Sequence, residues 1–81
     1  MVLTFDGDYD SIVGSRKDEF LESCSSKYTQ QNVNCVKVSS GSILVTFEGS
    51  ESNLAAVQDE VESNGLAIEG FPSLQLQPSK K

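Results

Sequence analysis

The chain has 81 residues and a mass of 8.8 kDa, which is enough for one small domain and too little for two. Twelve Asp and Glu residues against six Lys and Arg residues give a net charge of -6, which disfavours a nucleic-acid partner because the phosphate backbone is also negative. The sequence contains no His, and this excludes His-dependent nucleophile pairs and leaves no indication of a zinc site or another cofactor.

The N-terminal half predicts a strand, a helix and a second strand. Residues 2–5 are β-prone and end at the turn signal Asp6-Gly7-Asp8. Apolar side chains then recur at helical spacing through residues 16–29. Residues 33–38 are rich in β-branched side chains and predict the second strand.

The C-terminal half repeats this alternation. Residues 43–47 predict a third strand, joined to the second by a short connection that contains Gly41, so the two strands should form a β-hairpin. Ser50 or Ser52 can cap a second helix, and Asn64-Gly65 is a typical helix end.

The last strand is predicted from residues 66–68, from residues 74–76 or from both. The order strand, helix, strand, strand, helix, strand predicts an α+β fold of the ferredoxin-like βαββαβ type, a four-stranded antiparallel sheet with two helices on one face. We expect a single domain over residues 1–77 and a tail at residues 78–81.

Alternation of side chains assigns the inner and outer faces of the sheet. Val33 and Cys35 share a face, and Val38 joins them only if a β-bulge shifts the register. Cys35 then faces the helix layer, where Cys24 also points, and either a disulfide or two unpaired buried thiols fits this arrangement. The other expected core residues on the strands are Leu3, Phe5, Ile43, Val45 and Phe47.

The outer face of the sheet is the candidate contact surface, because an antiparallel sheet can leave one face open to a partner. Its mostly polar character fits a protein or carbohydrate partner, and the sequence does not indicate an oligomeric state. The candidate contact residues are Thr4, Leu44, Thr46 and Glu48, with Lys37 added if the bulge permits.

Asp6, Asp8 and Asp10 begin like a calcium-binding loop. Ser11 and Lys17 occupy the places where an EF-hand requires Gly and Glu, so we expect a solvated acidic turn and no metal site. The acidic residues of the second half predict a solvated helix face and not the paired carboxylates of an acid-base enzyme.

The hairpin segment Gly41-Ser42-Ile43-Leu44-Val45 resembles the Gly-Ser-Val-Val-Val segment of SEA domains. Together with Cys35 and Val38 ahead of it, the segment is still more similar to small SEA-like domains of secreted or surface proteins of algae and other protists. The resemblance spans roughly residues 2–70. It implies a non-enzymatic extracellular or cell-surface module for adhesion, matrix building or mechanical linkage, as one domain of a larger protein.

Two alternatives remain open at this point. Some SEA domains cleave themselves at this Gly-Ser bond, and the resemblance would make Ser42 the nucleophile and Gly41 the acyl donor. The other alternative is an intracellular, cytoplasmic ferredoxin-like scaffold for protein-protein interaction with both thiols reduced. We expect no insertion into a membrane, because the longest apolar run covers only residues 43–45 and a bilayer requires roughly 20 residues.

Overall fold

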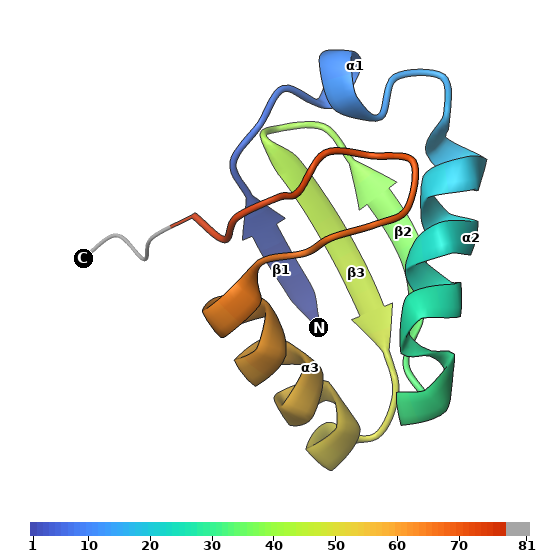
Figure 1. Cartoon of the computed structure of the whole chain (residues 1–81), viewed down its shortest axis with the longest axis vertical. Helices are drawn as coiled ribbons and strands as arrows, with labels where there is room; N and C mark the ends of the chain where they lie inside the picture. Colours follow the sequence, from blue (N-terminus) through green and yellow to red (C-terminus); the bar gives the residue numbers. More distant parts are fainter. Residues whose placement is uncertain (78–81) are drawn as a thin grey trace.

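The computed structural model describes residues 1–77 and shows an α+β fold in two layers (Figure 1). The α+β class expected from the sequence is confirmed. In chain order the elements are strand β1 (Val2–Phe5), helix α1 (Tyr9–Ile12), helix α2 (Lys17–Tyr28), the 3-10 turn η1 (Thr29–Gln31), strand β2 (Asn34–Ser39), strand β3 (Ile43–Glu48) and helix α3 (Glu51–Asn64).

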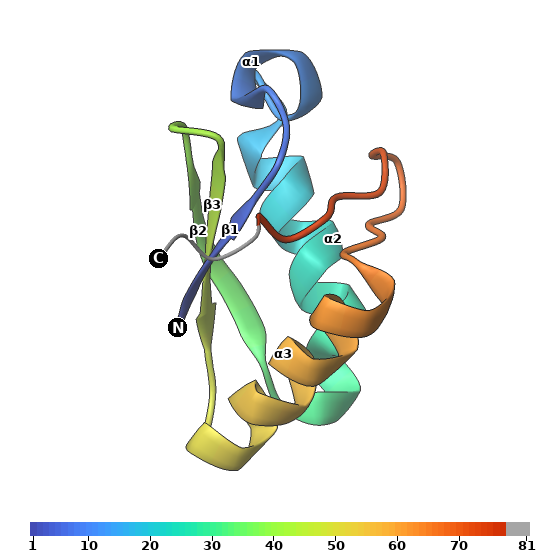
Figure 2. The same cartoon turned by 90° about the vertical axis from the view of Figure 1, so that its left-hand side faces the viewer.

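The sheet has three strands in the order β1-β3-β2, and β3 pairs antiparallel with both neighbours. Helices α2 and α3 lie on one side of this sheet, and no helix or strand of residues 1–77 covers its other face (Figure 2). The core therefore fills the space between the inner face of the sheet and the helices. Within residues 1–77, no helix combines the length and apolar character needed to cross a bilayer.

The inner face of the sheet carries the side chains that alternation assigns to it. All five strand residues named as core are buried, which confirms that phase for β1 and β3. The helices contribute Phe20, Tyr28, Val57 and Val61 to the same core. The rings of Tyr28 and Phe47 meet edge to face with their centroids 6.1 Å apart, an arrangement that aromatic pairs favour.

A β-bulge interrupts β2, as the burial of its side chains requires. The register against β3 shifts between Cys35 and Lys37, so that Cys35 pairs with Phe47 and Lys37 with Thr46. Cys35 and Val38 are consequently both buried, although an uninterrupted strand would place them on opposite faces.

Cys24 and Cys35 form a disulfide between α2 and β2, with their Cα atoms 5.8 Å apart. Of the two possibilities left open by the sequence, the structure therefore shows the bridged one. The bond spans a sequence separation of 11 residues, and closing a loop of this length in the unfolded chain stabilises the fold by about 3 kcal/mol in the chain-entropy model.

The residue next to this bridge fastens the backbone of the same strand. The hydroxyl of Ser25 donates a hydrogen bond to the carbonyl oxygen of Cys35 at 3.1 Å and accepts one from its N–H at 2.9 Å. These two backbone groups point away from β3, on the outer edge of β2. One helix side chain thus satisfies a part of the edge that would otherwise be open to another strand.

The expected fourth strand is absent from residues 1–77, so the four-stranded ferredoxin-like sheet is wrong. After α3, Leu66 and Leu74 pair with each other in an isolated bridge, and Leu76 makes another with Phe5 of β1. Of the two segments proposed for the last strand, residues 66–68 therefore join no sheet, and residues 74–76 touch β1 through this single bridge.

The fourth strand is missing from the described residues because the segment after α3 fills the core. Gly65 takes a φ of +75°, and a Cβ there would lie 2.7 Å from the carbonyl oxygen of Leu74, so the turn requires glycine. The chain then crosses the helix side of the sheet (Figure 1) and buries Leu66, Ile68 and Leu74. Core filling therefore uses the residues that a full fourth strand would need.

We predict that replacing Ser25 with Ala lowers the free energy of unfolding by about 1 to 3 kcal/mol, because both outward backbone groups of Cys35 lose their partner. Urea unfolding of the two proteins measures this difference. Ser26→Ala is the matched control, since Ser26 is exposed on the same helix, and it should change stability by less than about 0.5 kcal/mol. Equal effects of the two substitutions would contradict this role of the Ser25 hydroxyl.

A second prediction concerns Tyr28, whose hydroxyl is buried without a hydrogen-bond partner among the described residues. Burial, with a smaller contribution from the charge of Glu60, raises the pKa of Tyr28 to about 12. An unfolded tyrosine has a pKa of about 10, so the stability that depends on the neutral phenol is complete below pH 10 and is lost as the pH rises toward 12.

Tyr28→Phe should therefore leave stability unchanged or raise it by about 1 kcal/mol at pH 8, because an unsatisfied donor is removed. Between pH 8 and pH 11 the variant should lose less stability than the parent in urea unfolding, whereas the Tyr9→Phe control should retain the larger loss. A loss of more than about 1 kcal/mol in Tyr28→Phe at pH 8 would show that the hydroxyl makes a stabilising contact.

Candidate functional site

The face of the sheet opposite the helices is the candidate contact surface of the described residues. In every strand the side chains alternate between this open face and the core, as the burial patterns of β1 and β3 show. The bulge in β2 leaves Val36 and Lys37 both exposed between the buried Cys35 and Val38. We call this surface the open face; it consists of Val2, Thr4, Asn34, Val36, Lys37, Ser39, Leu44, Thr46 and Glu48.

The structure brings the four contact residues expected from the sequence onto this one surface. Thr4 pairs with Leu44, and the next row toward the end of β3 is centred on Thr46. Glu48 lies at the end of the same strand, opposite Asn34. Lys37 is also there, because the bulge places it beside Thr46. Whether these residues contact a partner stays a prediction.

Two residues of the open face were missed by sequence reasoning. Val2 and Val36 are 56% and 43% exposed, the exposed large hydrophobic side chains of residues 1–77. Both belong to the row of Thr46, with Val2 on one side and the bulge on the other. The alternation that identified Thr4 could have identified Val2, whereas Val36 depends on where the bulge falls.

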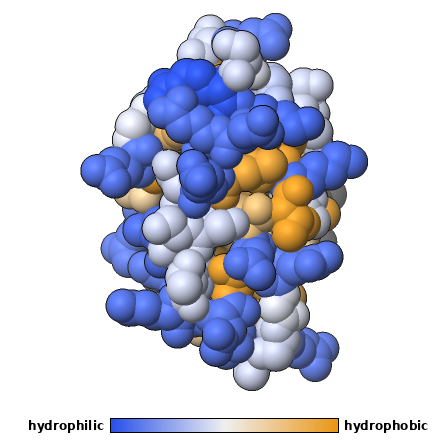
Figure 3. All heavy atoms as spheres, turned by 90° about the vertical axis from the view of Figure 1, so that its right-hand side faces the viewer, coloured by the Kyte–Doolittle hydropathy of each residue, from blue (hydrophilic) through white to orange (hydrophobic). Residues whose placement is uncertain are grey.

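The open face is almost uncharged in a strongly acidic molecule. Its strands contribute one cation, Lys37, and one anion, Glu48. Charged residues are therefore sparse on this face, as they are in the core of protein interfaces, and the one cation, Lys37, lies in the central row beside Thr46. The α2 side of the molecule is mostly hydrophilic, with hydrophobic atoms exposed near the middle of the view (Figure 3).

The ion pair of Arg16 and Glu19 lies away from the open face, at the start of α2. Two hydrogen bonds of 3.1 and 2.8 Å join the guanidinium to the carboxylate. The hydrogen bond from Arg16 lowers the pKa of Glu19, and the same contact raises the pKa of Arg16. The guanidinium also lies 4.2 Å from the centre of the Phe71 ring. This pair holds residues 70–71 against α2 and offers no second site.

The Gly41-Ser42 turn is placed at the end of the hairpin, with φ angles of +95° and +60°. The second value is unfavourable for a residue with a side chain, at a cost of roughly 1 to 2 kcal/mol. The hydroxyl oxygen of Ser42 accepts a hydrogen bond from the Gln77 side-chain N–H at 2.7 Å. A side-chain amide N–H is not a general base, so this contact does not activate Ser42 as a nucleophile.

The structure does not assemble the weak calcium candidate. Asp8 lies at the start of α1, where its carboxylate accepts a hydrogen bond from the Ser11 hydroxyl at 2.7 Å. Asp6 and Asp10 remain exposed on either side. Across residues 1–77, no three acidic, Cys or His side chains converge in a way that could hold a metal ion. Part of the expected acidic turn is a short helix instead.

Comparison with known proteins gives no match. Neither a protein-family model, nor a curated protein, nor a solved structure matches the chain.

The phase of the open face can be tested with two neighbouring residues of β3. Thr46→Ala should change the free energy of unfolding by less than about 1 kcal/mol, because its side chain faces away from the core. Val45→Ala should lower it by about 2 to 4 kcal/mol, since Val45 is fully buried. Urea unfolding of both variants makes the comparison, and comparable losses would contradict the assignment of Thr46 to a surface free for binding.

Proposed function

We propose that this chain is a non-enzymatic binding module of an extracellular or cell-surface protein, and that it contacts a protein partner through its open face. The observation that carries the proposal is the disulfide between Cys24 and Cys35. Structural disulfides persist in oxidising compartments and are rare where glutathione keeps thiols reduced.

The size of the domain strengthens this argument. An 81-residue chain buries only about two thirds of its unfolded surface, and the stability of such a domain is a few kcal/mol. A bond worth about 3 kcal/mol is then a large share of the total. The resemblance of the hairpin to SEA domains points in the same direction and stays a prediction.

The open face supports a protein partner in preference to a carbohydrate. Its exposed hydrophobic residues are the aliphatic Val2 and Val36, and its central row contains no aromatic ring on which a sugar could stack. Thr46 lies between Val2 on β1 and the bulge residues Val36 and Lys37 on β2. The β-branched side chains of this row are suited to packing against a second apolar surface.

The area of the face limits the strength of that contact. Three strands about 4.8 Å apart and up to six residues long present roughly 300 Å², whereas a stable interface buries about 800 Å² on each partner. The open face by itself therefore supports a weak contact, and a tighter one must extend over an adjoining edge of the sheet.

The expected dependence on the disulfide distinguishes this proposal from the intracellular scaffold. Reduction should lower the Tm of the protein by about 12 to 24 °C, because a loss of about 3 kcal/mol shifts a domain of this size by that amount. Thermal unfolding with and without dithiothreitol measures the shift. The double variant Cys24→Ala, Cys35→Ala should resemble the reduced protein and be insensitive to the reductant.

A Tm that is unchanged by reduction would favour the intracellular alternative, since the domain would then be equally stable with free thiols. The mass of the purified chain addresses the remaining alternative. One full-length species supports the non-enzymatic module, whereas two fragments covering residues 1–41 and 42–81 would show cleavage between Gly41 and Ser42 and refute it.

A further inference from the structure

Within residues 1–77, the outer edge of β1 is only partly paired. The Met1 nitrogen and Phe47 exchange two backbone hydrogen bonds, so the odd-numbered residues of β1 bond to β3 and the even-numbered ones point outward. Along this edge the N–H of Asp6 donates to Gln75, and the carbonyl of Thr4 accepts from Gln77.

The remaining outward groups of the edge have no such partner within residues 1–77. They are the N–H of Thr4 and both backbone groups of Val2. An unpaired row of alternating donors and acceptors on an edge strand is a template for another strand. The opposite edge of the sheet differs, because the Ser25 hydroxyl occupies the outward groups of Cys35.

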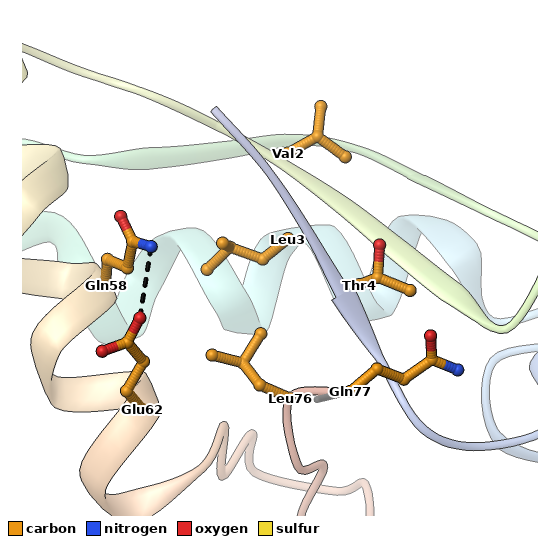
Figure 4. Close-up of a pocket in the computed structure, with 7 residues that line it drawn as sticks. All are labelled: Val2, Leu3, Thr4, Gln58, Glu62, Leu76 and Gln77. Atoms are coloured by element: carbon orange, nitrogen blue, oxygen red, sulfur yellow. Dashed lines mark hydrogen bonds between the residues drawn. The ribbon is translucent and has the colours of Figure 1, made fainter. Parts of the chain in front are cut away.

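A pocket of about 320 Å³ lies directly beside the unpaired stretch of β1. Figure 4 shows the side chains of Leu3 and Leu76 approaching each other at its centre, with Gln58 and Glu62 of α3 on one side. The side chain of Val2 points to the other face of the sheet. A strand added to this edge would place every second side chain on the side of the pocket.

The lining of the pocket specifies the kind of side chain that it fits. The partly buried Leu76 offers apolar contact to an aliphatic stem, and the exposed carboxylate of Glu62 offers a charge at its end. Gln58 donates a hydrogen bond of 3.3 Å to this carboxylate and so directs it. A Lys or Arg side chain has this combination of apolar stem and cationic head, and the net charge of -6 favours the approach of a basic segment.

We propose that the edge of β1 at residues 2–4 binds an extended basic segment of a partner protein as an added strand, with a Lys or Arg side chain in the pocket. Backbone hydrogen bonds then supply the attachment, and the pocket supplies the selectivity. The inference goes beyond the proposed function, because it concerns the sheet edge and requires neither the open face nor an extracellular setting.

A second copy of this chain does not fit the pocket. In an antiparallel pairing of two β1 edges, the side chains offered to the pocket would be those on the inner face of the other strand. These are Leu3 and Phe5, which are apolar and buried in the core. Neither can place a cation beside Glu62, and two molecules of charge -6 repel each other.

The direct test uses NMR of the full chain with three peptides of the form Val-Thr-X-Thr-Val, acetylated and amidated, in which X is Lys, Leu or Glu. The Lys peptide should slow hydrogen exchange at the amides of Val2 and Thr4 at least about tenfold when bound, since exposed amides become hydrogen-bonded. It should bind about two- to fivefold more tightly than the Glu peptide, as one exposed charge pair allows.

Matched variants separate the backbone from the pocket. Val2→Pro removes an outward N–H and should weaken binding of the Lys peptide at least about tenfold, while Val2→Thr keeps the N–H and should preserve it. Glu62→Gln should abolish the preference for Lys over Glu. Glu51→Gln makes the same change of net charge about 16 Å away along α3 and should retain the preference.

Several results would overturn the inference. They are the absence of protection at Val2 and Thr4 with all three peptides, equal binding by Val2→Pro and Val2→Thr, or a Lys preference that survives Glu62→Gln. Protection of the Thr4 amide in the free chain that disappears when residues 78–81 are removed would also overturn it, because the edge would already be occupied by the chain itself.

The proposed contact through the open face and the proposed strand addition at the β1 edge can be disproved independently. Thr46→Arg alters the open face and should leave binding of the Lys peptide unchanged. Loss of binding in Thr46→Arg together with normal binding in Val2→Pro would place the contact on the open face and refute the edge site. The change in Tm on reduction tests the extracellular setting and does not depend on the peptide binding of either variant.

Discussion

Cys35 is fastened to α2 in two ways, and the arrangement of the sheet depends on this attachment. Its side chain is bonded covalently to Cys24, and its backbone N–H and carbonyl both bond to the hydroxyl of Ser25. Two consecutive helix residues therefore fix the position of one strand residue. Because β2 is an edge strand, this contact holds it to the helix layer and also closes part of its outer edge to other strands.

The two edges of the sheet are consequently unequal. On the far side, the only backbone contact that β1 receives from residues 66–77 is the short contact of Gln75 and Gln77, because the preceding residues leave the sheet plane to complete the core. Burial of Leu66, Ile68 and Leu74 between sheet and helices outweighs the gain from a longer ladder of hydrogen bonds. As a result, residues 2–4 of β1 keep outward backbone groups that have no partner among residues 1–77.

The proposed binding surfaces follow from this asymmetry. The central row of the open face has Val2 at one side and the bulge residues Val36 and Lys37 at the other, and the stretch of β1 that is unpaired within residues 1–77 adjoins that row at Val2. A partner that adds a strand at the edge can extend across the open face, which alone is too small for a stable contact. The carboxylate of Glu62, which lies beside the edge, then favours a basic partner, as does the acidic character of the whole molecule.

The sequence by itself determined the local features of this protein: the α+β class, the strand phases that bury Phe5 and Val45, and a helix capped by Ser50 or Ser52. These follow from side-chain periodicity and capping, which act over a few residues. The structure shows that Ser50 is the cap, since its hydroxyl accepts a hydrogen bond from the N–H of Asn53. Only the tertiary structure decided that Cys24 bonds to Cys35, that Leu66 and Leu74 pair with each other, and that part of the β1 edge has no partner within residues 1–77. Such outcomes depend on competition between distant segments for the same core space and the same edge, and no local pattern records which segment prevails.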